Sequence, residues 1–201
     1  MFQIRIHGRG GQGVVTAAEM LSVAAFYENK YAQAFPSFGS ERMGAPVVAF
    51  CRVDDKEIRS REPIAEPDAL IIQDPTLLHQ VDLFSGVTPD AYILINTSRS
   101  FSELGLGEYA SQFKVERLLT VPATDLALAA FGRPVPNAAL LGAFAAITMR
   151  VSLKSVETAI RHRFSGSIAD GNVLAASQAF EFVKKELATI DSSNSSLAAP
   201  K

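Results

Sequence analysis

Four glycines stand within six positions near the start of the chain, with an arginine and a glutamine between them. The segment is Gly8-Arg9-Gly10-Gly11-Gln12-Gly13, between an alternating apolar and polar stretch and a stretch of helix-forming composition over residues 14–26. A strand, a glycine turn and a helix in this order build an anion site, because the N–H groups of the first helical turn point at a ligand that the glycines let approach. The spacing Gly8-x-Gly10-x-x-Gly13 also satisfies the dinucleotide pattern.

A second stretch, residues 37–46, is too polar and too broken by glycine and proline to belong to a core. Its hydroxyl, carboxylate and guanidinium groups can bind a ligand or another protein chain. No acid–base pair is evident elsewhere in the chain. The sequence therefore predicts binding residues and no catalytic residue.

One interpretation of the two stretches is that the chain is a non-catalytic subunit that helps to build an active site with partner chains. Two alternatives to this interpretation stay open at this point. The first is a dinucleotide-binding dehydrogenase or regulatory domain that uses the turn from Gly8 to Gly13. A dinucleotide site requires an acidic residue at the end of the second strand to bind the ribose hydroxyls. This chain has Phe35-Pro36-Ser37 there, and Glu28, the acid at about the right spacing, precedes the strand. The second alternative is that both stretches are only tight turns.

Composition excludes several classes of protein. The net charge of −2 and the pI near 5.9 give no electrostatic case for a nucleic-acid partner. The single cysteine, Cys51, excludes an internal disulfide and an iron–sulfur cluster or Cys-rich zinc site made by this chain alone. The three histidines lack metal-ligand spacing, so no metal site is predicted.

Hydropathy predicts a cytoplasmic chain with partners. No apolar run approaches the ~18 residues of a membrane span, and no basic and then apolar leader pattern begins the sequence. The expectation is a soluble cytoplasmic protein without a membrane partner. The mean hydropathy of +0.15 indicates that other chains cover some of its apolar surface.

The elements that must position the two stretches alternate along the chain. Strands are predicted over residues 31–34, 47–53 (with 57–59 as its hairpin partner), 69–74, 92–97 and 114–121, and helices over 75–83, 124–131 (capped by Thr124), 138–151, 155–164 and 172–187. This order predicts a three-layer α/β fold with a mostly parallel sheet and a helical C-terminal part, as one domain over residues 1–188. Residues 189–201 are predicted to be a disordered tail. The carboxyl ends of the strands are the expected ligand edge.

Four segments carry a resemblance to a known family. Residues 5–16, 31–48, 95–97 and 137–144 resemble the gamma subunit of the pyruvate and related 2-oxoacid:ferredoxin oxidoreductases, in the same order and at the family's spacing. The similarity runs from about residue 2 to residue 187. This chain has Ser40 where the family commonly has proline, and Met43 where it commonly has a basic residue. The departures leave the substrate open between pyruvate and a related acid such as phenylglyoxylate.

The resemblance implies a function that this chain exerts only with partners. The family's enzymes convert a 2-oxoacid and coenzyme A to an acyl-CoA and carbon dioxide with thiamine diphosphate and Mg²⁺. Electrons leave through iron–sulfur clusters to ferredoxin, or to NAD where a flavin (FAD) subunit is present. The alpha, beta and delta-type subunits hold these cofactors, and the gamma chain is a Rossmann-like domain that holds none alone and helps to enclose coenzyme A.

The residues expected to contact the cofactor are those of the two stretches and one helix start. They are Gly8, Arg9, Gly10, Gly11, Gln12, Gly13, Ser37, Ser40, Glu41, Arg42, Gly44 and Asn137. Arg9 and Arg42 are candidates for pairing with coenzyme A phosphates or with carboxylates of a partner subunit.

Overall fold

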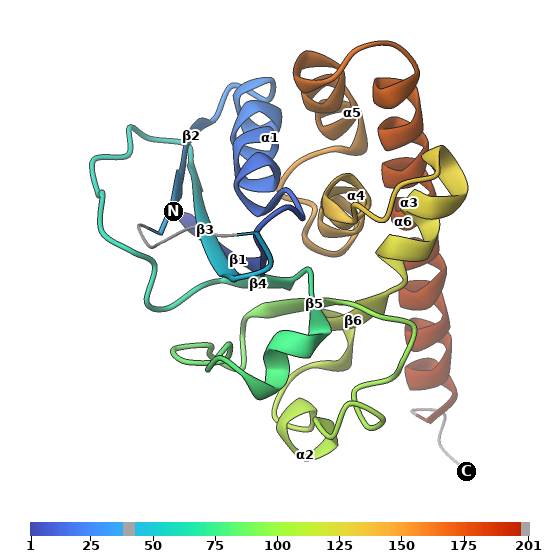
Figure 1. Cartoon of the computed structure of the whole chain (residues 1–201). Helices are drawn as coiled ribbons and strands as arrows, with labels where there is room; N and C mark the ends of the chain where they lie inside the picture. Colours follow the sequence, from blue (N-terminus) through green and yellow to red (C-terminus); the bar gives the residue numbers. More distant parts are fainter. Residues whose placement is uncertain (38–42, 198–201) are drawn as a thin grey trace.

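The computed structural model describes residues 1–37 and 43–197 and contains a six-stranded sheet (Figure 1). The strand order is β2-β3-β1-β4-β5-β6. The strands are β1 (Phe2–Arg9), β2 (Tyr31–Pro36), β3 (Pro46–Asp54), β4 (Ala69–Ile72), β5 (Tyr92–Asn96) and β6 (Leu118–Val121). β1, β4, β5 and β6 run parallel, and β3 runs antiparallel to both β1 and β2. The predicted α/β fold with a mostly parallel sheet is confirmed.

The predicted hairpin between residues 47–53 and 57–59 is wrong. β3 lies between β1 and β2, so both of its edges are already paired. Residues 57–59 form no strand, and Arg59 instead pairs with Glu57 in solvent at 3.1 Å. A three-residue polar segment has no apolar face to bury and no free strand edge to join.

In the described part of the chain, the longer helices form a layer on one face of the sheet (Figure 1). They are α1 (Val14–Phe26), α3 (Ala123–Phe131), α4 (Asn137–Thr148), α5 (Leu153–Arg163) and α6 (Gly166–Leu197). All 12 residues of α4 are buried, as expected for a helix that is apolar on every side. Gly142 lets α4 approach α6 closely, because a Cβ at this position would lie 2.0 Å from the Ala176 carbonyl oxygen.

The opposite face carries a thinner layer of loops and short helices. These helices are η1 (Pro75–His79), α2 (Gly107–Ala110) and η2 (Val115–Arg117). Leu70, Ile72, Ile93 and Ile95 of the central strands pack against this layer, so those strands are buried on both faces, as in parallel sheets generally. The predicted helix over 75–83 is shortened to η1, and the predicted strand over 114–121 splits into η2 and β6.

Two buried arginines hold the long connection between β3 and β4 against the sheet. Arg5 donates to the carbonyl oxygen of Ala65 at 3.2 Å in this connection, and it also reaches the next connection, between β4 and β5, through the Ser85 carbonyl oxygen at 2.7 Å. Arg52 donates to the carbonyl oxygen of Glu62 and stacks over the Phe35 ring at 5.1 Å from its centroid. Charged donors satisfy loop carbonyls that no ladder could pair, which lets this face of the sheet be covered without regular structure.

Helix ends differ from the prediction at α3, α4 and α6. The helix predicted over residues 138–151 ends at Thr148, because Met149 adopts a left-handed conformation at the C-cap. Thr124 does not cap α3, because Pro122 occupies the cap position and Thr124 bonds instead to Asn96. α6 begins at Gly166 and continues through Leu197, so residues 189–197 are helical where the sequence predicts a disordered tail. The Thr189 hydroxyl donates to the Lys185 carbonyl at 3.0 Å, a back-bond that suits a helix. The domain boundary at residue 188 stays a prediction.

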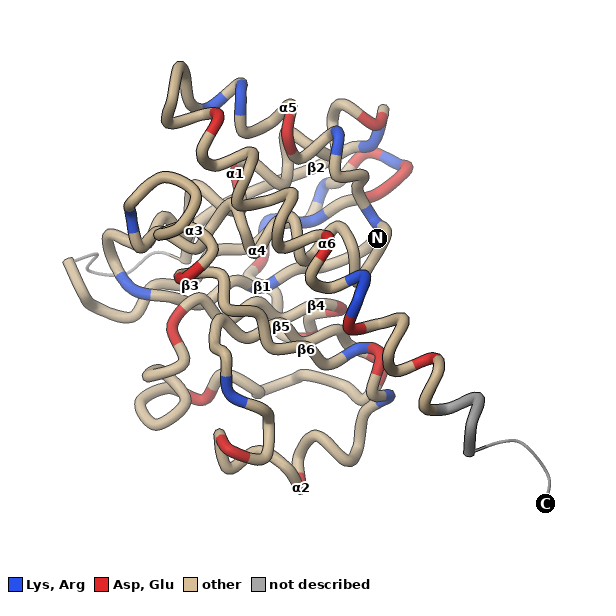
Figure 2. The backbone as a smooth tube through the Cα atoms, turned by 90° about the vertical axis from the view of Figure 1, so that its right-hand side faces the viewer, with Lys and Arg blue, Asp and Glu red and all other residues tan. Residues whose placement is uncertain are grey.

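Charged residues are not concentrated in one region of the described backbone. Lys and Arg are interspersed with Asp and Glu around the molecule (Figure 2). Among the described residues, no helix combines the length and apolar character that crossing a bilayer requires.

Candidate functional site

The glycine turn connects the carboxyl end of β1 to the start of α1. Gly13 is the N-cap of α1, with φ 71° and ψ 35°, and Gly11 has φ 96°. Both angles lie in the left-handed region that side chains disfavour. A Cβ on Gly13 would lie 2.5 Å from Nδ2 of Asn137, so space as well as conformation requires glycine at this position.

The first turn of α1 presents backbone donors at a hollow. The first hydrogen bond of the helix runs from the Ala17 N–H to the Gly13 carbonyl at 2.9 Å. The N–H groups of Val14, Val15 and Thr16 therefore precede the first intrahelical donor, and these residues border a hollow of about 410 Å³. Such a helix end favours an anion through its free N–H groups and its dipole.

The two predicted stretches meet at this hollow. Gly10 donates to the Ala45 carbonyl at 2.9 Å and accepts from the Gly44 N–H at 3.0 Å. Met43 lies against the turn, since a Cβ on Gly11 would come 2.6 Å from its sulfur. Residues 43–45 thus form one wall beside the glycines.

The remaining predicted residues of the second stretch are placed differently. Ser37 lies at the end of β2, separated from β1 by β3, and its N–H donates to the Val48 carbonyl at 2.8 Å. Ser40, Glu41 and Arg42 lie outside the described residues, so their contacts with a ligand or partner stay predictions.

Arg9 uses its guanidinium within the chain. Nε donates to Asp74 at 3.1 Å, Nη1 to the Gly44 carbonyl at 3.1 Å, and Nη2 to Thr76 at 2.7 Å and Gln80 at 3.0 Å. Four hydrogen bonds from a five-donor fork fix the side chain between the two stretches. Its contact with coenzyme A or a partner stays a prediction.

Gln12, within the turn, and Asp74, which follows β4, stabilise the turn through hydrogen bonds. The Arg9 N–H donates to Gln12 Oε1 at 2.8 Å, and Gln12 Nε2 donates to Asp74 Oδ2 at 2.8 Å. Asp74 also accepts from the Thr76 N–H at 2.9 Å. Asp74 was not among the predicted site residues, although an acid directly after a buried strand is the signal that could have identified it.

Two buried amides lie beneath the turn. Asn137 is 2% exposed, accepts from the Ala138 N–H at 2.8 Å and donates weakly to the Gly13 carbonyl at 3.5 Å, so it supports the turn from behind. Gln73 is 1% exposed, and neither of its side-chain polar atoms has a hydrogen-bond partner within the described residues. Gln73, Asp74 and Asn96 border a second hollow of about 320 Å³ at the carboxyl ends of the strands. Polar groups for a ligand or water are therefore available on this side as well.

The electrostatics of Asp74 support its stabilising role. Burial tends to raise the pKa of the Asp74 carboxyl, but hydrogen bonds from Thr76 and Gln12 and the charge of Arg9 outweigh burial and hold the pKa below its usual value. The carboxylate therefore stabilises the fold above about pH 4, and this contribution is lost as the pH falls toward the lowered pKa.

Replacing Asp74 with asparagine is expected to lower the free energy of unfolding by about 1.5 kcal/mol at pH 7, because a charge-assisted contact to Arg9 becomes a neutral one. Urea denaturation measures the free energy of unfolding of both proteins, and the difference between them should become smaller as the pH falls from 7 to 3. Asp170→Asn is the control, since Asp170 pairs with Arg161 in a 67% exposed setting and should change stability by less than about 0.5 kcal/mol. Equal losses at pH 7 and pH 3 would contradict the ionic role.

Among the described residues no cluster of three or more His, Cys, Asp or Glu side chains could hold a metal ion. Burial raises the pKa of the Cys51 thiol to about 12, so this side chain is protonated and inert at neutral pH. These residues form no ligand set for Mg²⁺ or an iron–sulfur cluster.

The alternative of a dinucleotide site requires, besides the glycine turn, an acidic residue that binds the ribose hydroxyls. The strand beside β1 on one side is β3, which starts at this edge of the sheet because it runs antiparallel. On the other side β4 is followed by Asp74, whose oxygens are already bonded to Arg9, Gln12 and Thr76. No described acid next to β1 is free to hold ribose hydroxyls in the way that a dinucleotide site requires.

Comparisons with known proteins place the chain in a family. The family model "Pyruvate ferredoxin/flavodoxin oxidoreductase" matches residues 3–182. The gamma subunit common to the pyruvate and ketoisovalerate oxidoreductases of Pyrococcus abyssi is 49% identical over 181 residues, covering 90% of this chain and 96% of the relative. The pyruvate synthase subunit PorC of Methanocaldococcus jannaschii is 47% identical over 186 residues, covering 92% and 99%.

A solved structure agrees with these relatives. The pyruvate oxidoreductase subunit PORC of Thermotoga maritima matches with a TM-score of 0.75 and 35% identity over 90% of this chain and 95% of that one. None of these names mentions NAD, so an NAD-linked variant is not supported. This chain belongs to the pyruvate ferredoxin/flavodoxin oxidoreductase family and matches its gamma subunits over nearly their whole length.

Proposed function

We propose that this chain is the gamma subunit of a thiamine diphosphate- and coenzyme A-dependent 2-oxoacid:ferredoxin oxidoreductase, assembled with alpha, beta and delta-type subunits. The proposed substrates are pyruvate and ketoisovalerate, because the names of the similar proteins include these acids. Within that enzyme the chain helps to enclose coenzyme A and to assemble the complex. Thiamine diphosphate, held by the partner subunits, supplies the electron sink that stabilises the carbanion after decarboxylation.

The observation that carries the proposal is the glycine turn at the start of α1. The N–H groups of Val14, Val15 and Thr16 border a hollow beside Gly10 and Gly11 and offer a partial positive charge to a phosphate. Arg9 and Asp74 hold the turn rigid, so little ordering entropy is lost when a ligand binds. Coenzyme A carries phosphates that fit such a site.

A charge at the rim of the hollow tests this role. Met43 is 88% exposed and lies against Gly11. In the purified complex, Met43→Glu is expected to raise the KM for coenzyme A about fivefold, because a carboxylate would repel the phosphates by about 1 kcal/mol. Met43→Lys is expected to lower it, and kcat should stay unchanged in both. The measurement is coenzyme A-dependent reduction of a viologen dye under anoxic conditions.

Leu128→Glu is the matched control, because Leu128 is an exposed apolar residue of α3 and should leave the KM unchanged. If neither Met43→Glu nor Met43→Lys changes the KM for coenzyme A, the glycine turn does not bind this ligand and has only a structural role. The same assay, run with pyruvate and with ketoisovalerate, names the substrate. Tight NAD binding by the chain without activity of the complex would favour the dinucleotide-binding alternative instead.

A further inference from the structure

A second surface, far from the glycine turn, exposes an unusual set of apolar side chains. α1 follows the carboxyl end of β1, and α4 begins at the same edge, where Asn137 lies against Gly13. The turns that follow these helices lie at the amino-end edge of the sheet, where Arg150 stacks over Phe2 at the start of β1. These turns, residues 26–31 and 149–152, define the amino-edge surface. It exposes Phe26 by 72%, Tyr27 by 46%, Tyr31 by 52% and Met149 by 85%. Aromatic residues and methionine are enriched in protein interfaces.

The two turns of the amino-edge surface are bound to each other. Lys30 Nζ donates to the Arg150 carbonyl at 2.5 Å, and Glu28 accepts from the Ser152 N–H. Lys30 also pairs with Glu28 at 3.3 Å. The turns that follow two helices distant in sequence are therefore joined into one surface.

Met149 occupies a position that favours glycine. It is the C-cap of α4 with φ 51°, a left-handed conformation that costs a residue with a side chain roughly 1 kcal/mol. Its side chain is nevertheless almost fully exposed and gains no burial in return. An apolar side chain kept at such a position is consistent with contact to another molecule.

The amino-edge surface contains a groove of about 770 Å³. Phe26, Tyr27, Tyr31 and Ala32 contribute apolar walls, and Lys30 and His162 lie among the lining residues. Phe26 and Tyr27 meet edge to face, with ring centroids 6.1 Å apart. A groove of this lining accepts an aliphatic or aromatic side chain, which is the usual anchor of a protein interface.

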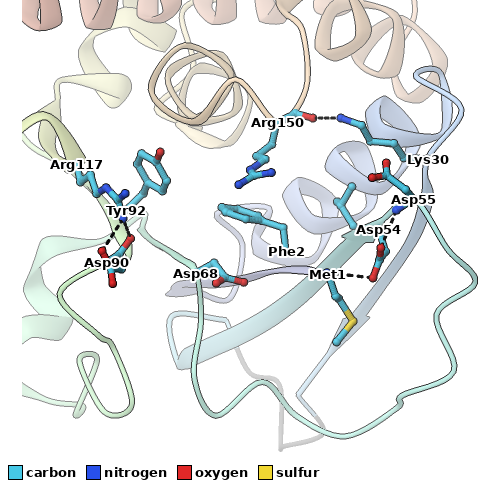
Figure 3. A pocket seen from close by; sticks show the side chains of 11 residues that line it. Met1, Phe2, Lys30, Asp54, Asp55, Asp68, Asp90, Tyr92, Arg117 and Arg150 are labelled. Carbon is cyan, nitrogen blue, oxygen red and sulfur yellow. Dashed lines mark hydrogen bonds and ion pairs between the residues drawn. The ribbon is translucent and has the colours of Figure 1, made fainter.

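Beside the groove, Arg150 supplies a positive charge that no described carboxylate pairs with. Lys30 lines both the groove and a neighbouring pocket of about 440 Å³. Figure 3 shows the Arg150 side chain directed into that pocket above Phe2, whose ring centroid is 4.5 Å from the guanidinium. Within the described residues, the Arg150 guanidinium makes no hydrogen bond or ion pair. By contrast, Arg117 of the same pocket pairs with Asp90 at 3.4 Å.

The mixed charge of the pocket favours a polypeptide as the occupant. Four carboxylates line it, those of Asp54, Asp55, Asp68 and Asp90. They would repel a phosphate or nucleotide that approached Arg150. A protein segment can place a single carboxylate on Arg150 and neutral or basic groups near the aspartates.

We propose that the amino-edge surface docks a segment of another subunit of the oxidoreductase, with an apolar side chain in the groove and a carboxylate on Arg150. The inference rests on the proposed function, because that function supplies the partner subunits. Under this proposal the two edges of the sheet have separate functions. The glycine turn binds the ligand, and the amino-edge surface binds the other subunit.

Photocrosslinking in the assembled complex tests the docking. Phe26 is replaced by p-benzoylphenylalanine in the chain co-expressed with its partner subunits, and the crosslinked peptide is identified by mass spectrometry. The expected product joins position 26 to a peptide of another subunit that contains Asp or Glu. The same label at Leu174, which is 46% exposed on α6, is expected to give no such product. A crosslink to a second copy of this chain, or none, would overturn the proposal.

A charge reversal provides the independent measurement. Arg150→Glu is expected to weaken binding of the chain to the remaining subunits at least tenfold, and Arg150→Lys should retain most of it. Arg59→Glu is the control, because the Arg59 side chain is 86% exposed and lines neither the groove nor the pocket of Arg150. The thermal unfolding of each variant chain is compared first, so that loss of folding is not mistaken for loss of docking.

The outcomes separate the two proposals. A wild-type complex that oxidises pyruvate with coenzyme A, but in which Phe26 crosslinks to no other subunit, would overturn the docking and leave the proposed function standing. A wild-type chain that assembles with no oxidoreductase subunit would overturn both.

Discussion

Replacing Gly13 with alanine is expected to lower the free energy of unfolding by about 3 kcal/mol. The left-handed backbone, φ 71°, costs an alanine about 1 kcal/mol. The added Cβ would lie 2.5 Å from Nδ2 of Asn137, which is 2% exposed and packed at the start of α4, and overpacking of this kind costs about 2 kcal/mol. Urea denaturation of the purified chain measures the loss.

Gly132 provides a matched control for the Gly13 prediction. It has the same φ of 71°, but nothing lies within 4 Å of its Cβ position. Gly132→Ala should therefore lose only the conformational part, about 1 kcal/mol. Adding Asn137→Ala to Gly13→Ala should recover part of the loss, because the two side chains compete for one space. Equal losses for the two single glycine variants would show that the contact with Asn137 does not matter.

The same variant reports on the ligand role. The clash of the new Cβ with Asn137 is expected to shift the start of α1, where Val14, Val15 and Thr16 border the hollow. In the assembled complex, Gly13→Ala is expected to raise the KM for coenzyme A more than Gly132→Ala does. This comparison separates an effect on the turn from a general loss of stability.

Patterns that depend on local sequence could be predicted. The helix over residues 14–26 has the bounds of α1, because it lies between a glycine turn and the Asn29-Lys30 turn and contains no glycine or proline. The runs of β4 and β5 were recognisable as buried strands because they are almost continuously apolar. Residues 43–45 of the second stretch and Asn137 contact the glycine turn, as expected from strands whose carboxyl ends share an edge.

Pairings chosen by the tertiary fold could not be predicted. β3 joins β1 and β2 rather than a local hairpin partner, because eight residues of β1 and six of β2 align with it and residues 57–59 offer no comparable face. The network of Arg9 with Asp74 and Gly44 joins three separate segments of the chain, and sequence patterns do not give the side-chain direction that this needs. The exposure of the amino-edge surface likewise depends on how α1 and α4 end side by side, which hydropathy alone does not show.

Acidification is expected to destabilise the chain through His7 well before most carboxylates are protonated. His7 lies on β1, is 5% exposed, and its Nε2 has no hydrogen-bond partner within the described residues. Burial, and secondarily the nearby charge of Arg5, lower the pKa of His7 from 6.5 to about 4. The folded chain therefore keeps this imidazole neutral over a range in which the unfolded chain protonates it.

The direction of the effect follows from proton uptake. Between pH 6.5 and pH 4 the unfolded state holds one more proton at His7 than the folded state, so the free energy of unfolding falls as the pH falls. At about 1.4 kcal/mol per unit of pKa difference, the loss amounts to about 2 kcal/mol between pH 7 and pH 5 and about 3 kcal/mol by pH 4. Above pH 7 the contribution is constant.

Urea denaturation at pH 7, 6 and 5 measures this dependence where carboxylates still contribute little. His7→Gln is expected to remove most of the slope, whatever its effect on absolute stability at pH 7. His162→Gln is the control, because His162 is exposed at the end of α5 and should leave the slope in place. If His7→Gln keeps the wild-type slope, the acid sensitivity arises elsewhere in the chain and the buried imidazole is already compensated. If the slope disappears, a single histidine on the central strand sets the acid limit of the fold that presents the glycine turn.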